Sequence, residues 1–145
     1  MNALWHALSM SFKTEISIHF DEADPAGIAF SGGVFTKMHR CYEEFITALG
    51  QNPQKFFLNP EVIFPLRHME ADYFAPLMPL EKYQVSIGVL KNSDTSFQLQ
   101  YEISKGETKH CVVRSTHVCV DKSTMKKTAM PSDLKQNLET FVIPQ

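Results

Sequence analysis

The sequence predicts an α+β fold in which one long central helix is wrapped by a curved antiparallel β-sheet. Three observations lead to this prediction. Residues 14–20 alternate between apolar and polar side chains, residues 33–49 carry apolar side chains at three- and four-residue steps, and four further alternating segments follow. Alternation is typical of a half-buried strand, and the longer step is typical of an amphipathic helix. A helix with so wide an apolar stripe needs a sheet to cover it.

Length, composition and charge limit the classes of function. The chain has 145 residues, of which 43% are hydrophobic, and this is enough for a sizeable core. We expect a single domain over residues 14–145, after an N-terminal extension over residues 1–13. The net charge of −2 gives no reason to expect nucleic acid or a membrane surface as a partner.

Other sequence signals concern the compartment and bound groups. No apolar stretch approaches the length of about 18 residues that a membrane span needs, and the first residues lack a basic leader, so we expect no signal peptide. The odd cysteine count, without zinc spacing, predicts reduced thiols and a cytoplasmic protein. The six histidines form no His-x-His or His-x-x-x-His pair. We therefore expect no metal site and no cofactor.

The first strand leads into an acidic turn. In residues 14–20, the apolar positions Ile16, Ile18 and Phe20 are expected to face the core, whereas His19 is expected at the surface. Three acids then follow within four positions, and a Pro-Ala-Gly turn comes after them at residues 25–27. A carboxylate in a tight turn before a helix could carry out chemistry, because the first free N–H groups of a helix can bind a substrate oxygen. A solvated acidic turn with a helix cap is the alternative.

The predicted helix covers residues 33–49 and ends at Gly50 in the C′ position. It would be about 25 Å long. The apolar stripe consists of Val34, Met38, Cys41, Phe45 and Leu49. The polar side consists of Lys37, Arg40, Glu43, Glu44 and Thr47.

Four strands in a meander are expected after the helix and a proline-containing loop at residues 51–60. They would cover residues 62–74, 83–89, 97–103 and 109–121. A short C-terminal helix is expected to begin at residues 131–133. Such a sheet has two edges, and pairing of edges between subunits would protect them, so we expect a homodimer or homotetramer.

The segment from Glu22 to Phe30 reads Glu-Ala-Asp-Pro-Ala-Gly-Ile-Ala-Phe. It resembles the acid-x-Asp-x-x-Gly-[Ile/Val]-x-[aromatic] pattern between the first strand and the helix of the hotdog-fold acyl-CoA thioesterases. The branch named for 4-hydroxybenzoyl-CoA thioesterase is the most similar one. Weaker matches lie at residues 70–77, 96–102 and 118–131, so the resemblance covers roughly residues 14–138.

The resemblance implies a hotdog fold and hydrolysis of an acyl thioester. The second acid of the motif is catalytic in that family, and it falls on Asp24, whereas Asp21 and Glu22 are expected to be solvated or structural. We expect the backbone N–H of Ser31 to bind the carbonyl oxygen, with Phe30 and Gly27 beside the substrate. Asp24 could activate a water molecule or attack the carbonyl itself.

Several departures leave alternatives open. The family's usual Asn and Tyr are missing from residues 31–34, and residues 91–96 lack the basic cluster that grips CoA phosphates in aromatic thioesterases. The carrier could therefore be CoA or acyl carrier protein, and the acyl group aryl or aliphatic. A non-catalytic hotdog module that binds an acyl thioester is the main alternative function. Ser31 as a nucleophile, with a distant partner such as His68, ranks below it. A hotdog dehydratase ranks last, because it would need a catalytic histidine early in the helix and His39 lies too far along.

Overall fold

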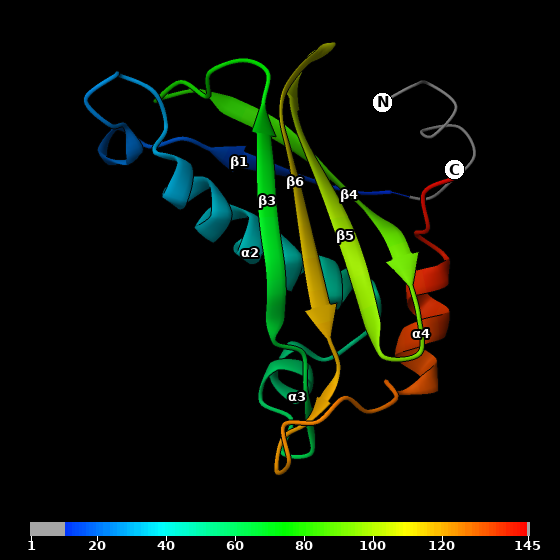
Figure 1. Ribbon diagram of the computed structural model, residues 1–145. Coiled ribbons are helices and arrows are strands. Elements are labelled where there is room, and N and C mark those ends of the chain that lie inside the picture. The colour runs from blue at the N-terminus through cyan, green and yellow to red at the C-terminus, as the bar shows by residue number, and fades with distance from the viewer. Residues whose placement is uncertain (1–10, 145) are drawn as a thin grey trace.

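The computed structural model describes residues 11–144, and it confirms the predicted α+β architecture (Figure 1). A five-stranded antiparallel sheet curves around one long helix. Most of the expected N-terminal extension, residues 1–10, lies outside the described residues.

The elements of the sheet and their bounds are as follows. In spatial order the strands are β1 (Phe12–Ser17), β4 (Lys82–Asn92), β5 (Ser96–Lys105), β6 (Thr108–Val118) and β3 (Leu66–Tyr73). A separate pair of short strands consists of β2 (Val62–Ile63) and β7 (Val120–Asp121). The helical elements are η1 (Phe20–Glu22), α2 (Ser31–Ala48), α3 (Pro53–Phe57) and α4 (Ser132–Glu139).

The core lies between α2 and the concave face of the sheet. Residue pairing places Ile87 opposite Tyr101, and Tyr101 opposite Val113, so that one buried row crosses the three central strands. The predicted apolar stripe of α2 is buried against this face. The helix ends at Ala48 with Leu49 as its C-cap, and Gly50 follows with a φ of 85°, a left-handed conformation that glycine adopts without strain.

Two segments that were each expected to form one continuous strand form two strands instead. The strand expected over residues 62–74 divides into β2 and β3, because Pro65 lies between them and cannot donate to a ladder. The strand expected over residues 109–121 divides into β6 and β7 at Cys119, whose N–H donates to the carbonyl oxygen of Thr95 at 2.7 Å. The meander is also shorter than expected, since β3 pairs with β6 and not with β4.

Three side-chain or loop predictions also differ from the structure. Phe20 is 75% exposed, because the chain leaves the strand after Ser17 and turns into η1. Lys37, expected on the polar side of the helix, is only 9% exposed. The loop expected over residues 51–60 contains α3, which Asn52 caps by accepting a hydrogen bond from the N–H of Lys55 at 3.0 Å.

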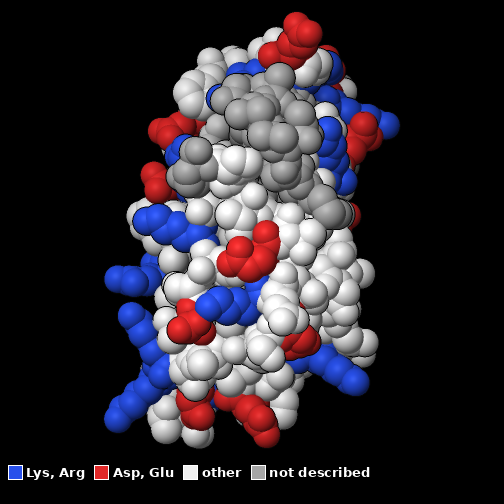
Figure 2. All heavy atoms as spheres, turned by 90° about the vertical axis from the view of Figure 1, so that its right-hand side faces the viewer, with Lys and Arg blue, Asp and Glu red and all other residues white. Residues whose placement is uncertain are grey.

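The charge distribution agrees with the small net charge. The face that includes α4, on the right-hand side of Figure 1, carries basic and acidic side chains in alternation (Figure 2). On this face Lys135 of α4 pairs with Asp94 in the loop before β5. The visible part of this face therefore has no extended patch of one sign.

Candidate active site

Asp24 lies in a closed turn between η1 and α2. The N–H of Asp24 donates to the carbonyl oxygen of Ile28 at 2.9 Å, and the N–H of Gly27 donates back to Asp24 at 2.9 Å. Gly27 has a φ of 81°, which explains why the motif places glycine at this position. The turn is short and is closed by its own backbone, so it holds the side chain of residue 24 in one place.

The carboxylate of Asp24 has one oxygen engaged and one available. Oδ1 accepts a hydrogen bond from the N–H of Ala26 at 2.8 Å. Oδ2 has no hydrogen-bond partner among residues 11–144. The side chain is partly exposed, so one carboxylate oxygen can reach water or a substrate.

The start of α2 leaves two backbone donors open. The N–H groups of Gly33 and Val34 both donate to the carbonyl oxygen of Phe30, at 3.0 and 3.3 Å. The N–H groups of Ser31 and Gly32 donate to no residue in the part of the chain that the structure describes. Free N–H groups at a helix start attract negative charge, and the helix dipole adds to this attraction.

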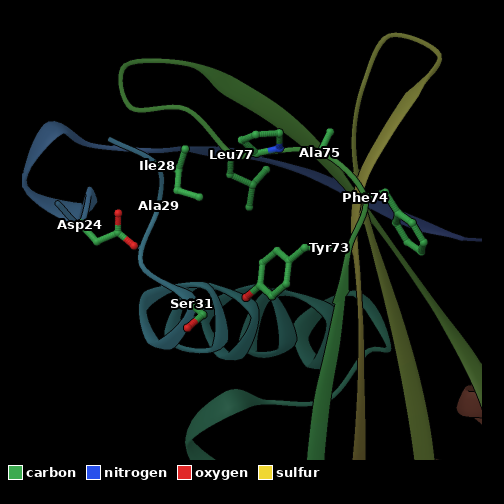
Figure 3. Close-up of a pocket in the computed structure, with 9 residues that line it drawn as sticks. Asp24, Ile28, Ala29, Ser31, Tyr73, Phe74, Ala75 and Leu77 are labelled. Atoms are coloured by element: carbon green, nitrogen blue, oxygen red, sulfur yellow. The ribbon is translucent and has the colours of Figure 1, made fainter. Parts of the chain in front are cut away.

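Asp24 and Ser31 both line a cavity of about 370 Å³. The other lining residues are Ile28, Ala29, Tyr73, Phe74, Ala75, Pro76 and Leu77. Figure 3 shows the Asp24 carboxylate pointing into this space from one side, and the ring of Tyr73 reaching from the end of β3 toward α2 on the other. The Asp24 carboxylate and Ser31, the first residue of α2, therefore share one largely apolar cavity, and Gly32 lies next to it in the chain.

The cavity wall after β3 was not predicted as part of the site. The end of the second strand was recognised as a family match, but nothing in its local pattern connects it with residue 24. The structure joins the two through a hydrogen bond from Ala29 to Leu77 at 2.8 Å. Burial raises the pKa of Tyr73, with a further contribution from Cys111, so its phenol stays neutral.

Gly27 and Phe30 flank the cavity without lining it. The ring of Phe30 covers Gly32, since a Cβ built on Gly32 would lie 2.6 Å from a ring carbon of Phe30. Phe30 itself is largely exposed. Gly27 and Phe30 thus contact the backbone of residues that form the site, and neither is part of the cavity wall.

Comparison with known proteins decides the family. A family model described as the Thioesterase-like superfamily matches residues 18–138. The chain belongs to the thioesterase-like superfamily. It is accordingly a thioesterase, and the pattern at residues 22–30 lies within the matched region.

Curated relatives of this thioesterase cover almost its whole length. A 1,4-dihydroxy-2-naphthoyl-CoA hydrolase of Nostoc punctiforme is 32% identical over 131 residues, which are 90% of this chain and 88% of the relative. A protein of the same name from Microcystis aeruginosa is 29% identical over 118 residues, which are 81% of this chain and 86% of the relative.

Solved structures show that the thioesterase has the hotdog fold. A 1,4-dihydroxy-2-naphthoyl-CoA thioesterase from Synechocystis superposes with a TM-score of 0.80 at 23% identity, covering 89% of this chain and 96% of that one. A gentisyl-coenzyme A thioesterase superposes with a TM-score of 0.78 at 20% identity, covering 88% of this chain and 99% of that one.

The structure also places the residues of the lower-ranked alternatives in this thioesterase. The hydroxyl of Ser31 has no hydrogen-bond partner among the described residues. His68 pairs with Glu70 on β3 at 3.5 Å. His39 lies 3.6 Å from Glu43 on the third turn of α2 and does not line the cavity of Asp24. These positions give no support to a serine–histidine pair or to a histidine-based dehydratase.

Residues 11–144 contain neither a metal-binding cluster nor a membrane-spanning helix. No three side chains of His, Cys, Asp or Glu come together as a cluster that could hold a metal ion. None of the helices in the same range has the length and hydropathy needed to cross a membrane.

Proposed function

We propose that this thioesterase hydrolyses an aryl-CoA thioester to the free acid and CoA, with Asp24 as the general base. One observation carries the proposal: a partly exposed carboxylate with a free oxygen shares a cavity with the open start of α2. The leaving thiolate has a pKa of about 8.5, so its departure needs little help from an acid. The site then has two tasks, which are to activate water and to stabilise the oxyanion.

The N–H groups of Ser31 and Gly32 are the proposed oxyanion donors. They belong to the first turn of α2, where N–H groups have no partner within the helix, and they donate to none of the described residues. One such donor typically contributes about 3 kcal/mol in the transition state. The positive end of the helix dipole favours the same charge.

The lining and volume of the cavity and the names of the relatives support an aryl acyl group. The wall is formed by apolar and aromatic side chains, with Tyr73 and Phe74 at the end of β3. The volume of about 370 Å³ lies in the range of small-molecule sites. The names of the relatives described above give 1,4-dihydroxy-2-naphthoyl-CoA or gentisyl-CoA as their substrates. We also assign the chain to the branch of 4-hydroxybenzoyl-CoA thioesterase, on the motif at residues 22–30.

CoA is the proposed carrier. We do not assign its phosphates to the loop before β5, because polar side chains at this loop already bond with α4. Asp94 of this loop is paired with Lys135, and the amide of Asn92 donates to the carbonyl oxygen of Lys135 at 3.0 Å. The loop is thus engaged with α4. Acyl carrier protein is the alternative carrier that the substrate panel below tests.

A comparison of Asp24→Asn with Asp21→Asn tests the catalytic assignment. Asparagine keeps an Oδ1 that can accept from Ala26, so the turn should survive. Asp21 is an exposed acid of the same segment and serves as the matched control. Thiol release from benzoyl-CoA, hydroxybenzoyl-CoA, an aliphatic acyl-CoA and an acyl carrier protein thioester is measured for each. We expect Asp24→Asn to lose about 100- to 10,000-fold in kcat, and Asp21→Asn to retain it.

The same assay can contradict the proposal. Equal rates for Asp24→Asn and the wild type would remove Asp24 from the mechanism. Binding of the thioester without thiol release would support the non-catalytic module. A single turnover in ¹⁸O-labelled water tests the nucleophilic role of Asp24, since label in its carboxylate would require an anhydride that is hydrolysed at the Asp24 carbonyl. General-base catalysis places the label only in the acid product, as does hydrolysis of the anhydride at the acyl carbonyl.

We further propose that the protein is a homodimer joined through β3. This strand is an edge of the sheet, and no other strand of the described chain pairs with its outer side. Exposed apolar side chains lie at its two ends, namely Leu66, Tyr73 and Phe74. An open edge of this length favours pairing with a second copy.

The three buried free cysteines support the cytoplasm as the compartment.

A further inference from the structure

Lys37 is an unusual lysine. It lies on the second turn of α2, and only 9% of it is exposed, although lysines are seldom buried without a partner. Its Nζ lies 3.2 Å from Oε1 of Glu22, the last residue of η1. The pair therefore joins the central helix to the segment just before the Asp24 turn.

Glu22 is the centre of a small network. Its Oε1 also accepts a hydrogen bond from the backbone N–H of His19 at 2.7 Å. The same oxygen lies 2.9 Å from the ring Nδ1 of His19. Desolvation alone would raise the pKa of Glu22, but the hydrogen bonds from His19 and Lys37 outweigh it and lower the pKa. Glu22 is thus an ionised carboxylate that three donors hold in place.

The backbone of Glu22 is tied to the helix start as well. Its carbonyl oxygen accepts the N–H of Phe30 at 2.8 Å, and Phe30 is the N-cap of α2. On the opposite side of the turn, Ala29 donates to Leu77 of the cavity wall. The Asp24 turn is therefore held from the sheet by Leu77 and from the helix by the pair of Glu22 and Lys37.

We propose that Lys37 is a positioning residue for hydrolysis, because its ion pair with Glu22 sets where the Asp24 carboxylate stands relative to the open amides of α2. This inference rests on the proposed function of Asp24. Lys37 does not line the cavity and acts through Glu22. A displacement of about 1 Å between catalytic groups can cost about 100-fold in rate. Loss of the pair would loosen one of the two supports of the turn.

A positioning role for Lys37 changes kcat and KM in a way that a purely structural role does not. The substrate meets the wall after β3, which Lys37 does not touch, so KM should change little. The carboxylate and the amides act on the transition state, so kcat should fall. A residue needed only for folding would lower the melting temperature and leave the kcat of the folded enzyme unchanged.

The test uses variants from both sides of the pair and a matched control. Lys37→Met removes the charge and keeps the length, Lys37→Arg keeps the charge, and Glu22→Gln removes the partner's charge. Lys82→Met is the control, since Lys82 pairs with Glu15 at 3.9 Å with both side chains exposed. Steady-state kinetics with the best aryl-CoA substrate are measured well below each melting temperature, after wild-type turnover and its loss in Asp24→Asn have been established.

We expect Lys37→Met and Glu22→Gln each to lower kcat about tenfold, with KM within about twofold of the wild type. Lys37→Arg should recover most of kcat, and Lys82→Met should match the wild type. The double variant should be no slower than either single variant, because one unit is lost in each case. Unchanged kcat in both single variants would overturn the proposal while leaving Asp24 in its role. If Lys37→Met does not fold, Glu22→Gln decides the question alone.

Discussion

Ala29 donates its backbone N–H to the carbonyl oxygen of Leu77 at 2.8 Å, and this hydrogen bond joins the two walls of the cavity. Ala29 follows the Asp24 turn, whereas Leu77 follows the edge strand β3. Leu77 is buried, so the contact is anchored in the core. The Asp24 turn is therefore positioned by the segment that follows β3 as well as by its own sequence.

The two glycines at the start of α2 should respond differently to alanine. A Cβ on Gly32 would lie 2.6 Å from the ring of Phe30, whereas a Cβ on Gly33 would meet no atom within 4 Å. Gly32→Ala should displace Phe30 or the first turn of the helix and lower kcat about tenfold or more. Gly33→Ala should keep kcat and raise the free energy of unfolding by about 0.5–1 kcal/mol. Urea unfolding and thiol-release kinetics measure both effects, and equal kcat values for the two variants would contradict this view.

Tyr73 should contribute to the preference for aryl substrates. Its ring lines the cavity at the end of β3 and points toward α2 (Figure 3). Aromatic contacts of this kind contribute about 0.5–1.5 kcal/mol. Tyr73→Ala should lower kcat/KM about tenfold for benzoyl-CoA and less for a short aliphatic acyl-CoA. Tyr73→Phe keeps the ring and should match the wild type on both substrates; a uniform loss on all substrates would speak against a role in selectivity.

His117 is a buried histidine that should make the fold sensitive to acid. Its ring is stacked on Tyr42 with centroids 4.4 Å apart, and on Phe97 with centroids 5.0 Å apart. Its Nε2 lies 2.8 Å from the hydroxyl of Ser115, which is in turn 3.1 Å from the hydroxyl of Tyr101. Burial, with a smaller contribution from the charge of His39, lowers the pKa of His117 from 6.5 to about 3.

The sign of the pH effect follows from this shift. Between pH 3 and 6.5 the unfolded chain binds a proton at His117 that the folded chain does not, so the free energy of unfolding falls as the pH falls below 6.5. At about pH 5 this amounts to a loss of about 2 kcal/mol relative to neutral pH. His117→Phe keeps the stacked ring and should reduce the difference between the two pH values by that amount. Denaturant unfolding at both pH values measures it, and an unchanged difference would count against a neutral His117.

A proline in the edge strand should separate the proposed dimer. Phe74 donates to His110 of β6, so by alternation the N–H groups of Met69, Ala71 and Tyr73 face the open edge. Ala71→Pro removes one edge donor without removing a bond to β6. We expect it to shift the molecular mass from dimer toward monomer in light scattering. Ala71→Val is the control of similar volume that keeps the N–H, and it should remain dimeric; a dimer in both variants would place the interface elsewhere.

Local periodicity was sufficient for most of the elements and for part of the site. The helix, the central strands and the C-terminal helix follow from patterns that neighbouring residues impose on the backbone. Asp24 and Ser31 are close in sequence, so a motif of a few residues could associate them before any tertiary contact is known. Some failures were local, such as the strand that Pro65 divides. Others depended on a segment outside the local pattern, as with Lys37, which the helical pattern assigned to solvent and which is buried in an ion pair with Glu22.

The sequence by itself therefore determined most of the segments that form strands and helices, and that a carboxylate stands in a tight turn ahead of a helix. Only the tertiary structure decided that the end of β3 closes the cavity, that Lys37 is buried, and that His117 packs against two aromatic rings. The physical reason is the distance along the chain over which each effect acts. Backbone conformation depends mainly on side chains a few residues apart, whereas burial and cavity walls depend on which strands become neighbours in the sheet.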